Sequence, residues 1–354
     1  MRVQKWELAN KIKKLRSVVP KLTTAPILQN ILVENGTLTA TNMELTVSTK
    51  LQGAEGESML IPVKAFGLID QLPNGEVEIT KNAGGNRIMI KAGDSIRNAF
   101  EIMDPAEFPK GSMYGTDEGW ASIDGEDLTR ALRNVLYAVS KTAAKPQMCT
   151  VCMECSEGTL SFFGLNGQQV AWDKIPYDGD FRLLIPRTAA EQLISTGLEG
   201  DVVISYSKLA ASFRSDEYTI STRLVDGEYF NVRKMFASEG TGVELIREAF
   251  TKAVRRADMC NEDTSPVPVR IDIEGDNMNV YIKSSTAAYR EALPVTTDMA
   301  DKLTIAFNPA LLKTTMDSFT DDRVEAYFQS PKHPMIVKSK TSQLKAMLLP
   351  VLFR

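Results

Sequence analysis

The chain has 354 residues, of which 43% are hydrophobic and 24% charged, a composition typical of soluble globular proteins with room for two or three domains. Its formal net charge of −4 excludes a protein that is basic throughout, but it allows a local basic surface. The first residues lack the apolar core of a secretory signal, and no apolar run approaches the roughly 20 residues that cross a bilayer. We therefore expect a cytoplasmic protein without a membrane partner.

Three kinds of element recur along the chain in the same order: an amphipathic helix, a strand hairpin, and a strand–helix–strand unit. The helices are predicted over 3–19, 124–141 and 242–259. The hairpins are predicted over 27–41, 149–163 and 268–282. The strand–helix–strand units are predicted over 59–80, 183–205 and 303–328.

Each strand–helix–strand unit has a proline at the expected first helical position, where its missing N–H costs nothing: Pro62, Pro186 and Pro309. Equivalent elements are about 120 residues apart, which is one domain of ordinary size. We predict three repeated domains, over 1–118, 119–239 and 240–354.

Three of the four cysteines, Cys149, Cys152 and Cys155, are spaced as ligands of a zinc or iron–sulfur site would be. They fall in the first strand of the second predicted hairpin, where alternate side chains point to opposite faces. Three thiolates on such a strand cannot close on one metal without a bulge, and Cys260 lies in another repeat. Buried free thiols are the favoured interpretation. A thiol- or metal-dependent enzyme remains the alternative.

Other catalytic signals are weak. The one histidine, His333, is expected in a loop, and adjacent Asp321 and Asp322 are expected to be solvated turn residues. The glycine-rich stretch 82–87 is predicted to be a turn between strands rather than a phosphate-binding loop. We expect no catalytic residue, no metal and no cofactor.

Basic side chains recur on the first helix of each repeat, although the chain as a whole is acidic. One such helix is most simply a solvated surface, but the recurrence favours a surface that attracts a polyanion. The chain ends in the apolar run 348–353, which is either a last core strand or the lining of a groove for an apolar peptide.

Taken together, the whole chain resembles the bacterial DNA polymerase III beta subunit family, the sliding clamps. The residues that carry the resemblance are "PILQNILVENGTLTAT", "DGEYFNVRKMF", "IAFNPALLKTTMDSF" and "SPKHPMIVKS", with three repeats and a short tail after a proline. The resemblance implies an α+β clamp fold in which each domain has two inner helices and outer antiparallel sheets. It also implies a head-to-tail homodimeric ring.

In such a ring the basic helices would contact the phosphates of duplex DNA without reading its sequence. The DNA-binding residues that the resemblance implies are Lys11, Lys14, Arg16, Lys21, Lys64, Arg130, Arg133, Lys141, Lys145, Arg187, Lys252, Arg255, Arg256 and Lys313. For Arg255 and Arg256, the neighbouring subunit is the open alternative to DNA.

The family binds partner proteins through a short apolar peptide in a pocket between the second and third domains. The implied pocket residues are Leu165, Asn166, Gly167, Val170, Phe230, Lys234, Met235, Leu349, Pro350, Val351 and Leu352. The chain departs from the family there, because Thr-Asp-Gly-His-Arg-Leu reads Leu-Asn-Gly-Gln-Gln-Val over 165–170 and Phe-Pro reads Tyr229-Phe230. The usual ending Met-Pro-Met/Val-Arg reads Leu-Pro-Val-Leu over 349–352.

The implied function is that of a processivity factor, which catalyses nothing and tethers a polymerase to DNA. The implied partners are duplex DNA, a second copy of the chain, the replicative polymerase subunit, an ATP-dependent clamp loader and other proteins with clamp-binding peptides. A clamp-like scaffold for repair proteins is a further alternative, which the altered pocket alone supports.

Overall fold

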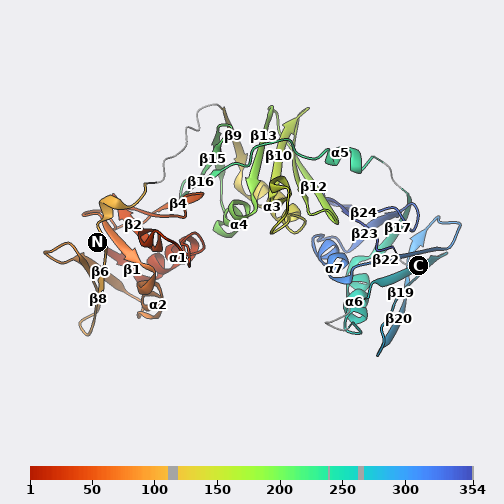
Figure 1. Cartoon of the computed structure of the whole chain (residues 1–354), viewed down its shortest axis with the longest axis horizontal. Coiled ribbons are helices and arrows are strands. Elements are labelled where there is room, and N and C mark those ends of the chain that lie inside the picture. The colour runs from red at the N-terminus through yellow and green to blue at the C-terminus, as the bar shows by residue number, and fades with distance from the viewer. Residues whose placement is uncertain (111–118, 238–239, 262–266, 353–354) are drawn as a thin grey trace. The chain divides into compact units, whose positions relative to one another are not determined.

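The computed structural model describes residues 1–110, 119–237, 240–261 and 267–352 (Figure 1). One order of elements occurs three times: a strand, a helix, four strands, a second helix and three strands. Short extra pieces interrupt it, among them α5 (Val232–Met235), β21 (Thr296–Thr297) and the 3-10 helices Pro26–Gln29, Pro105–Glu107 and Pro146–Cys149. The repetition inferred from the sequence is therefore present in the structure.

The bounds of the elements follow the repeats. The first repeat contains β1 (Arg2–Gln4), α1 (Lys5–Leu15), β2 (Asn30–Glu34), β3 (Thr37–Thr41), β4 (Leu45–Lys50), β5 (Met59–Pro62), α2 (Val63–Gln71), β6 (Glu76–Lys81), β7 (Arg87–Ala92) and β8 (Ile96–Glu101). The second contains β9 (Gly119–Asp124), α3 (Gly125–Leu136), β10 (Thr150–Ser156), β11 (Thr159–Leu165), β12 (Gln169–Pro176), β13 (Phe181–Pro186), α4 (Arg187–Thr196), β14 (Asp201–Tyr206), β15 (Ala210–Arg214) and β16 (Tyr218–Arg223). The third contains β17 (Thr241–Ile246), α6 (Arg247–Asp258), β18 (Val269–Glu274), β19 (Asn277–Lys283), β20 (Ala288–Pro294), β22 (Leu303–Phe307), α7 (Pro309–Asp317), β23 (Arg323–Phe328), β24 (Met335–Lys338) and β25 (Lys345–Leu348).

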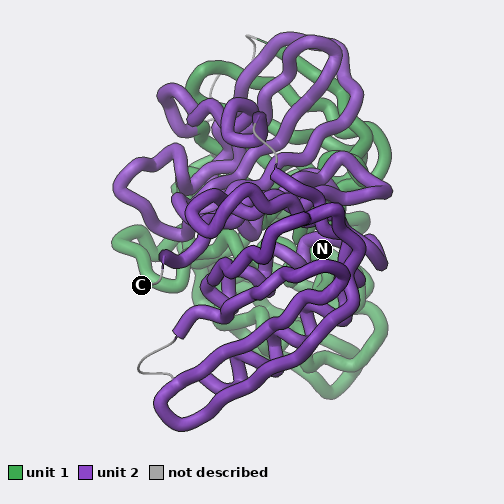
Figure 2. The backbone as a smooth tube through the Cα atoms, turned by 90° about the vertical axis from the view of Figure 1, so that its right-hand side faces the viewer, with its two compact units in different colours: residues 1–129, 188–224 green, residues 130–187, 225–354 purple. Residues whose placement is uncertain are grey.

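The chain forms two compact units, residues 1–129 with 188–224 and residues 130–187 with 225–354 (Figure 2). The first unit has a four-stranded sheet in the order β1-β6-β7-β8 and an eight-stranded sheet, β5-β2-β3-β4-β16-β15-β14-β9. The second has a four-stranded sheet, β20-β19-β18-β22, and a nine-stranded sheet, β13-β10-β11-β12-β25-β24-β23-β17-β21. Both large sheets join strands of two successive repeats, so each unit contains part of the middle repeat.

The contact division therefore differs from the predicted domains, and the three-domain boundaries stay a prediction. The boundary at 118/119 involves residue 118 and the boundary at 239/240 involves residue 239, and both of these residues lie outside the described ones.

The helices form because their apolar side chains recur at helical spacing and cover the sheets. On α1, Leu8, Ile12 and Leu15 are fully buried. The helix is shorter than the predicted 3–19, because residues 2–4 pair with β6 as strand β1. Pro309 is the first residue of α7 as predicted, whereas Pro62 and Pro186 end the preceding strands, one residue before their helices.

Two side chains show how tertiary contacts override a local prediction. Asp321 was expected to be solvated, but it is 6% exposed and accepts hydrogen bonds from the side chains of Ser339 and Thr341 and from the backbone N–H of Lys340. That prediction is wrong, because partners 18 to 20 residues further along the chain enclose the carboxylate. His333 lies in a loop as predicted, beside the hydroxyl of Ser330.

Candidate nucleic-acid and peptide interfaces

The basic residues of α1 and its loop differ in exposure. Lys11 is 5% exposed, and its ammonium contacts the carboxylate of Glu217 and lies 4.8 Å from the centre of the Tyr218 ring. Burial lowers the pKa of Lys11, against a smaller raising effect of the Glu7 charge. Lys14 is half-buried and donates to the carbonyl of Ser195. Lys11 is therefore committed to a contact within the protein.

On α3 and α4 one predicted cation is exposed and two have internal partners. Arg133 is exposed. Arg130 donates to the buried carboxylate of Asp173 at 3.2 Å. Arg187 donates to the carbonyls of Leu136, at 3.0 Å, and Val139, which lie at the end of α3 and just beyond it. Arg187 therefore has a structural role whatever else it contacts.

The predicted DNA-binding cations of α6 are exposed but paired. Lys252 contacts Glu248 one turn earlier at 2.6 Å, and Arg255 contacts Asp317 of α7 at 3.0 Å. Arg256 contacts Glu291 of β20 at 2.6 Å and also donates to the hydroxyl of Tyr289. The Arg256 guanidinium thus lies on the edge strand of a sheet.

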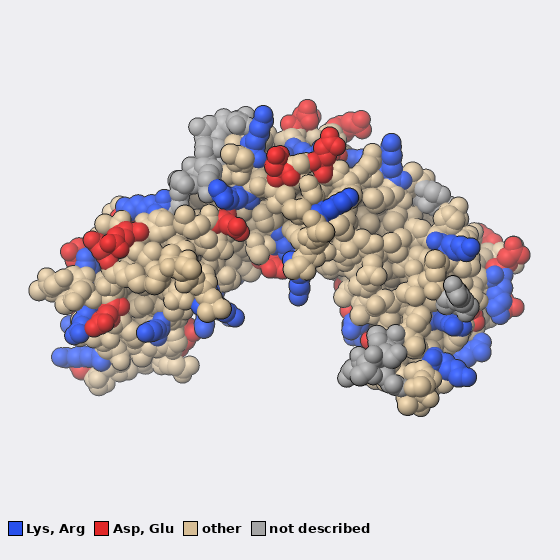
Figure 3. Space-filling view, viewed as in Figure 1, with Lys and Arg blue, Asp and Glu red and all other residues tan. Residues whose placement is uncertain are grey.

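The other predicted DNA-binding residues are reachable from solvent. Arg16, Lys21, Lys64, Lys141 and Lys145 are exposed, and Lys313 is half-buried. Basic and acidic side chains are interspersed on the surface in Figure 3. The structure thus offers exposed cations in all three repeats without a field of one sign over the face shown.

The predicted peptide site is built on the turn between β11 and β12. The side-chain oxygen of Asn166 accepts from the backbone N–H groups of Gln168 and Gln169 at 3.0 and 2.8 Å. Gly167 has φ = 87°, which favours glycine, and a Cβ there would lie 3.3 Å from Cε of Met148. The backbone N–H of Leu349 donates to the Gln168 carbonyl at 2.9 Å, so the C-terminal tail runs beside the turn.

Beyond this turn, the site is a partly covered apolar surface. Leu165 and Val170 are buried in a cluster with Met347, and Phe230 packs against the same cluster. Met235 is 39% exposed, Leu349 44% and Leu352 69%, while Lys234 and Gly167 are exposed and Pro350 and Val351 half-buried. The chain therefore ends β25 at Leu348 and continues as an apolar tail in which Leu349 and Leu352 are exposed, and the peptide groove stays a prediction.

Two residues beside the predicted peptide site were not singled out from the sequence. Gln169 is 1% exposed, and its amide donates to the Leu311 carbonyl at 3.0 Å and to the Thr315 hydroxyl at 2.9 Å, both on α7. Its side-chain oxygen accepts from Asn166 at 3.0 Å. Arg233 lies 5.6 Å from the centre of the Trp172 ring. No local pattern marks Gln169, because its partners on α7 are more than 140 residues away in the chain.

The first unit contains a matching turn with different chemistry. Asn42 accepts from the N–H groups of Glu44 and Leu45 at 3.0 and 2.8 Å, and the Arg223 N–H donates to the Glu44 carbonyl. Met43, which is 50% exposed with φ = 77°, stands where the second turn has Gly167. A side chain therefore covers in the first unit the position that is open in the second.

The cysteines do not form a metal site among the residues that the structure describes, where no cluster of three potential ligands occurs. Cys149 ends a 3-10 helix instead of beginning the strand, while Cys152 and Cys155 lie buried on β10. Burial raises the pKa of the Cys152 thiol, which makes it a poor nucleophile. The thiol- or metal-dependent enzyme is not supported. None of the described helices is long and apolar enough to span a membrane.

Comparison with known proteins bears on the fold first. The structure matches that of a putative DNA polymerase III beta subunit from Eubacterium rectale with a TM-score of 0.90 and 21% identity, covering 99% of this chain and 98% of that one. It matches a sliding clamp from Bartonella birtlesii, solved with griselimycin bound, with a TM-score of 0.91 and 19% identity over 100% and 99%. The predicted α+β clamp fold is confirmed.

Sequence comparison then gives the family. Residues 1–112 match the family model described as DNA polymerase III beta subunit, N-terminal domain, and residues 237–351 match the one described as C-terminal domain. The beta sliding clamp of Chlamydia muridarum is 24% identical over 366 residues, 97% of this chain and 96% of the relative. The chain belongs to the DNA polymerase III beta subunit family, the bacterial beta sliding clamps, which are processivity factors rather than enzymes.

Proposed function

We propose that two copies of this chain close head to tail into a ring around duplex DNA in the cytoplasm. The ring holds the replicative polymerase, and other proteins with clamp-binding peptides, close to the DNA. An ATP-dependent loader opens it. The observation that carries the proposal is that the chain already joins successive repeats twice by the same strand pairing.

The two joints inside the chain predict the third. Strand β4 of the first repeat pairs with β16 of the second, and β12 of the second pairs with β25 of the third. In the order of elements, β20 is the equivalent of β4 and β12, and β8 is the equivalent of β16 and β25. Both β20 and β8 are edge strands of their sheets. A second copy supplies the missing neighbour, so β20 of one subunit pairs with β8 of the other and no such edge stays open.

The side chains on the helix-covered face of these strands suit a subunit interface. Ile96 and Phe100 of β8 are only half-buried in one chain. On β20, Tyr289 and Glu291 point to the equivalent face, and Arg256 is bound to both of them. We therefore assign Arg256 to the subunit joint rather than to DNA.

The DNA contacts are proposed for the exposed cations. These are Arg16, Lys21, Lys64, Arg133, Lys141 and Lys145. Lys313, Lys252 and Arg255 are included as further candidates, and Lys11 is left out because it is buried. Such contacts go to phosphates, so binding should be independent of the DNA sequence. The logarithm of the binding constant should fall linearly with the logarithm of the salt concentration.

The peptide site is proposed for the apolar surface between the turn 165–170, the segment 229–236 and the tail 349–352. Griselimycin, which is bound to the sliding clamps of Bartonella birtlesii and Pseudomonas aeruginosa, is the probe for it. Binding to this chain, with a loss on Leu352→Asp and none on the exposed control Leu209→Asp, would support the site.

The ring itself is tested by molar mass in solution and by retention on DNA. Light scattering after size exclusion should give a mass of twice 39.1 kDa across a dilution series. The protein, once loaded, should stay on circular DNA and slide off the same DNA after linearisation. Phe100→Asp should give monomers, because it puts a carboxylate into the joint, whereas Leu209→Asp should stay dimeric. A wild-type monomer at every concentration would overturn the ring.

A further inference from the structure

The register of the proposed joint follows from the two joints within the chain. In the first, Leu45 lies opposite Thr222, and in the second, Gln169 lies opposite Leu348. Leu45 and Gln169 are each the fourth residue of a turn. In each turn the backbone N–H of the fourth residue donates to the side chain of the first, Asn42 or Asn166. In the third repeat the same bond joins Ser284 and Ala287, so Ala287 is the equivalent residue.

The partner position on β8 is fixed in the same way. Just beyond the pair Ala210–Arg223, the backbone N–H of Leu224 donates to the carbonyl of Leu209, which continues the β15–β16 ladder by one bond. The N–H beyond the pair Arg87–Glu101 does the same for β7–β8, from Ile102 to Asn86. Glu101 is thus the equivalent of Arg223, and Phe100 the equivalent of Thr222. The third joint then places Ala287 opposite Phe100.

The joints differ at the pair three positions further on. This pair is reached by counting three residues toward the C-terminus on one strand and three toward the N-terminus on its antiparallel partner. In the first joint it holds Ser48 opposite Thr219, which are uncharged. In the second it holds Trp172 opposite Lys345, whose ammonium lies 5.0 Å from the ring centre, an attractive contact. In the third it holds Arg290 of one subunit opposite Arg97 of the other, and like charges directly opposite destabilise a strand pair.

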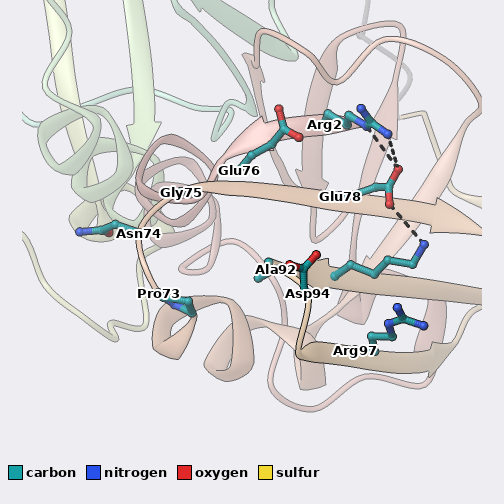
Figure 4. A pocket seen from close by; sticks show the side chains of 11 residues that line it. Arg2, Pro73, Asn74, Gly75, Glu76, Glu78, Ala92, Asp94 and Arg97 are labelled. Atoms are coloured by element: carbon teal, nitrogen blue, oxygen red, sulfur yellow. Dashed lines mark hydrogen bonds and ion pairs between the residues drawn. The ribbon is translucent and has the colours of Figure 1, made fainter.

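Further cations surround Arg97 on its own sheet. The cross-strand register puts Arg2, Glu78, Lys91 and Arg97 in one row on the exposed face. Glu78 is linked to Arg2 at 3.1 Å and to Lys91 at 3.3 Å, as the dashed lines in Figure 4 show, and these bonds lower the pKa of Glu78. The one carboxylate in the row is therefore shared by two cations, and Arg97 has no such link to the residues drawn in the figure.

A cavity opens beside this row. It has a volume of about 550 Å³ and is lined by Arg2, Lys91 and Arg97, together with the turns 73–76 and 93–94 (Figure 4). Two more carboxylates, Glu76 and Asp94, also line it. In one chain the three lining cations balance the three lining carboxylates, Glu76, Glu78 and Asp94. The joint would bring Arg290 of the partner subunit to the open side of the cavity, because neighbouring strands lie only about 4.8 Å apart.

We propose that this cavity is an anion site completed at the subunit joint, where a small phosphate-class oxyanion is held by Lys91 and Arg97 of one subunit and Arg290 of the other. Guanidinium groups bind such an oxyanion with paired N–H donors. The bound anion replaces the repulsion across the strand pair by two attractions, so ring closure and anion binding support each other. The inference rests on the proposed ring and adds a ligand that controls it.

The test is the dimer dissociation constant, measured by sedimentation in sodium chloride and in sodium phosphate or pyrophosphate of equal ionic strength and pH. We expect phosphate to tighten the wild-type dimer at least tenfold. Arg290→Gln and Arg97→Gln should each dimerise more tightly than wild type in chloride and lose most of the phosphate effect. Lys50→Gln, which removes an exposed cation from the other sheet, is the control and should behave as wild type.

The outcomes separate this inference from the ring itself. A wild-type monomer under all conditions would overturn the ring. A dimer equally tight in chloride and phosphate would overturn the anion site alone, as would a phosphate effect that persists in both arginine variants. If Asp94 instead neutralises the partner's Arg290, Asp94→Asn will weaken the dimer in chloride, and that result also overturns the anion site.

Discussion

Replacement of Gln169 by leucine tests whether the turn at the proposed peptide site is held in place by helix α7. Leucine keeps most of the volume but removes the bonds to Leu311, Thr314, Thr315 and Asn166, which measure 2.9 to 3.0 Å. The Leu311 carbonyl keeps a second donor in the Thr314 hydroxyl at 2.9 Å. The fully buried Thr315 hydroxyl loses a partner, and a buried polar group left unpaired costs about 1–3 kcal/mol.

That loss should appear in two measurements. The urea midpoint should fall by an amount that corresponds to about 1–3 kcal/mol of unfolding free energy. Griselimycin should bind roughly fivefold more weakly by calorimetry, because the bond between turn and helix is worth about 1 kcal/mol and the ligand requires the turn in place. Gln168→Leu, at the exposed neighbouring position, is the control and should change neither value by more than experimental error.

A glutamate at position 169 gives a sharper distinction. Its ionised form still accepts from Asn166 but cannot donate to the Leu311 carbonyl, whereas its protonated form can. Griselimycin binding by Gln169→Glu should therefore recover as the pH falls, while binding by Gln168→Glu should not. If Gln169→Leu bound griselimycin as wild type does, the turn would not depend on α7 and the reasoning would be refuted.

Three further predictions concern charged residues. Lys11→Met should leave the unfolding midpoint unchanged or raise it at pH 7. Because burial lowers the folded-state pKa of Lys11, the charged side chain costs stability at neutral pH, and this cost fades as the pH rises toward 10.5. The Glu217 carboxylate, whose side chain is 58% exposed, stays solvated in the variant. Asp321→Asn should cost about 1–3 kcal/mol of unfolding free energy in urea at pH 7 and progressively less below about pH 4. Burial raises the carboxyl pKa, but the hydrogen bonds together outweigh it and lower that pKa, so their stabilisation is lost as the pH falls through it. An equal loss at pH 3 would contradict this. Arg133→Ala should reduce the salt slope of DNA binding by about 1 without lowering the thermal midpoint, whereas Arg187→Met should lower the midpoint because it removes a donor from the carbonyls of Leu136 and Val139; calorimetry and binding titrations separate the two.

The sequence predicted the features that depend on neighbours along the chain. The repeated helices and the hairpins at Gly36 and Gly158 were recoverable because helical spacing, strand alternation and turn glycines are local signals. The burial of Lys11 was not, because Glu217 is 206 residues away. Strand β1 was read as helix for the same reason, since its register comes from β6. Likewise, no local pattern indicates that sheets of successive repeats merge.

The two joints within the chain and the proposed third joint use the same strand pairing for two purposes, which are to connect successive repeats and to close the ring. Covalent continuity holds the first two joints together, and the position of Ser48 in the first and of Trp172 in the second is neutral or attractive. In the proposed ring, the third joint has no peptide link and would have to open for DNA to enter. There the same position would oppose Arg97 and Arg290, which would make this joint the weakest by charge as well as by connectivity. An anion that strengthens it would make closure depend on solution conditions, while the two internal joints keep their register.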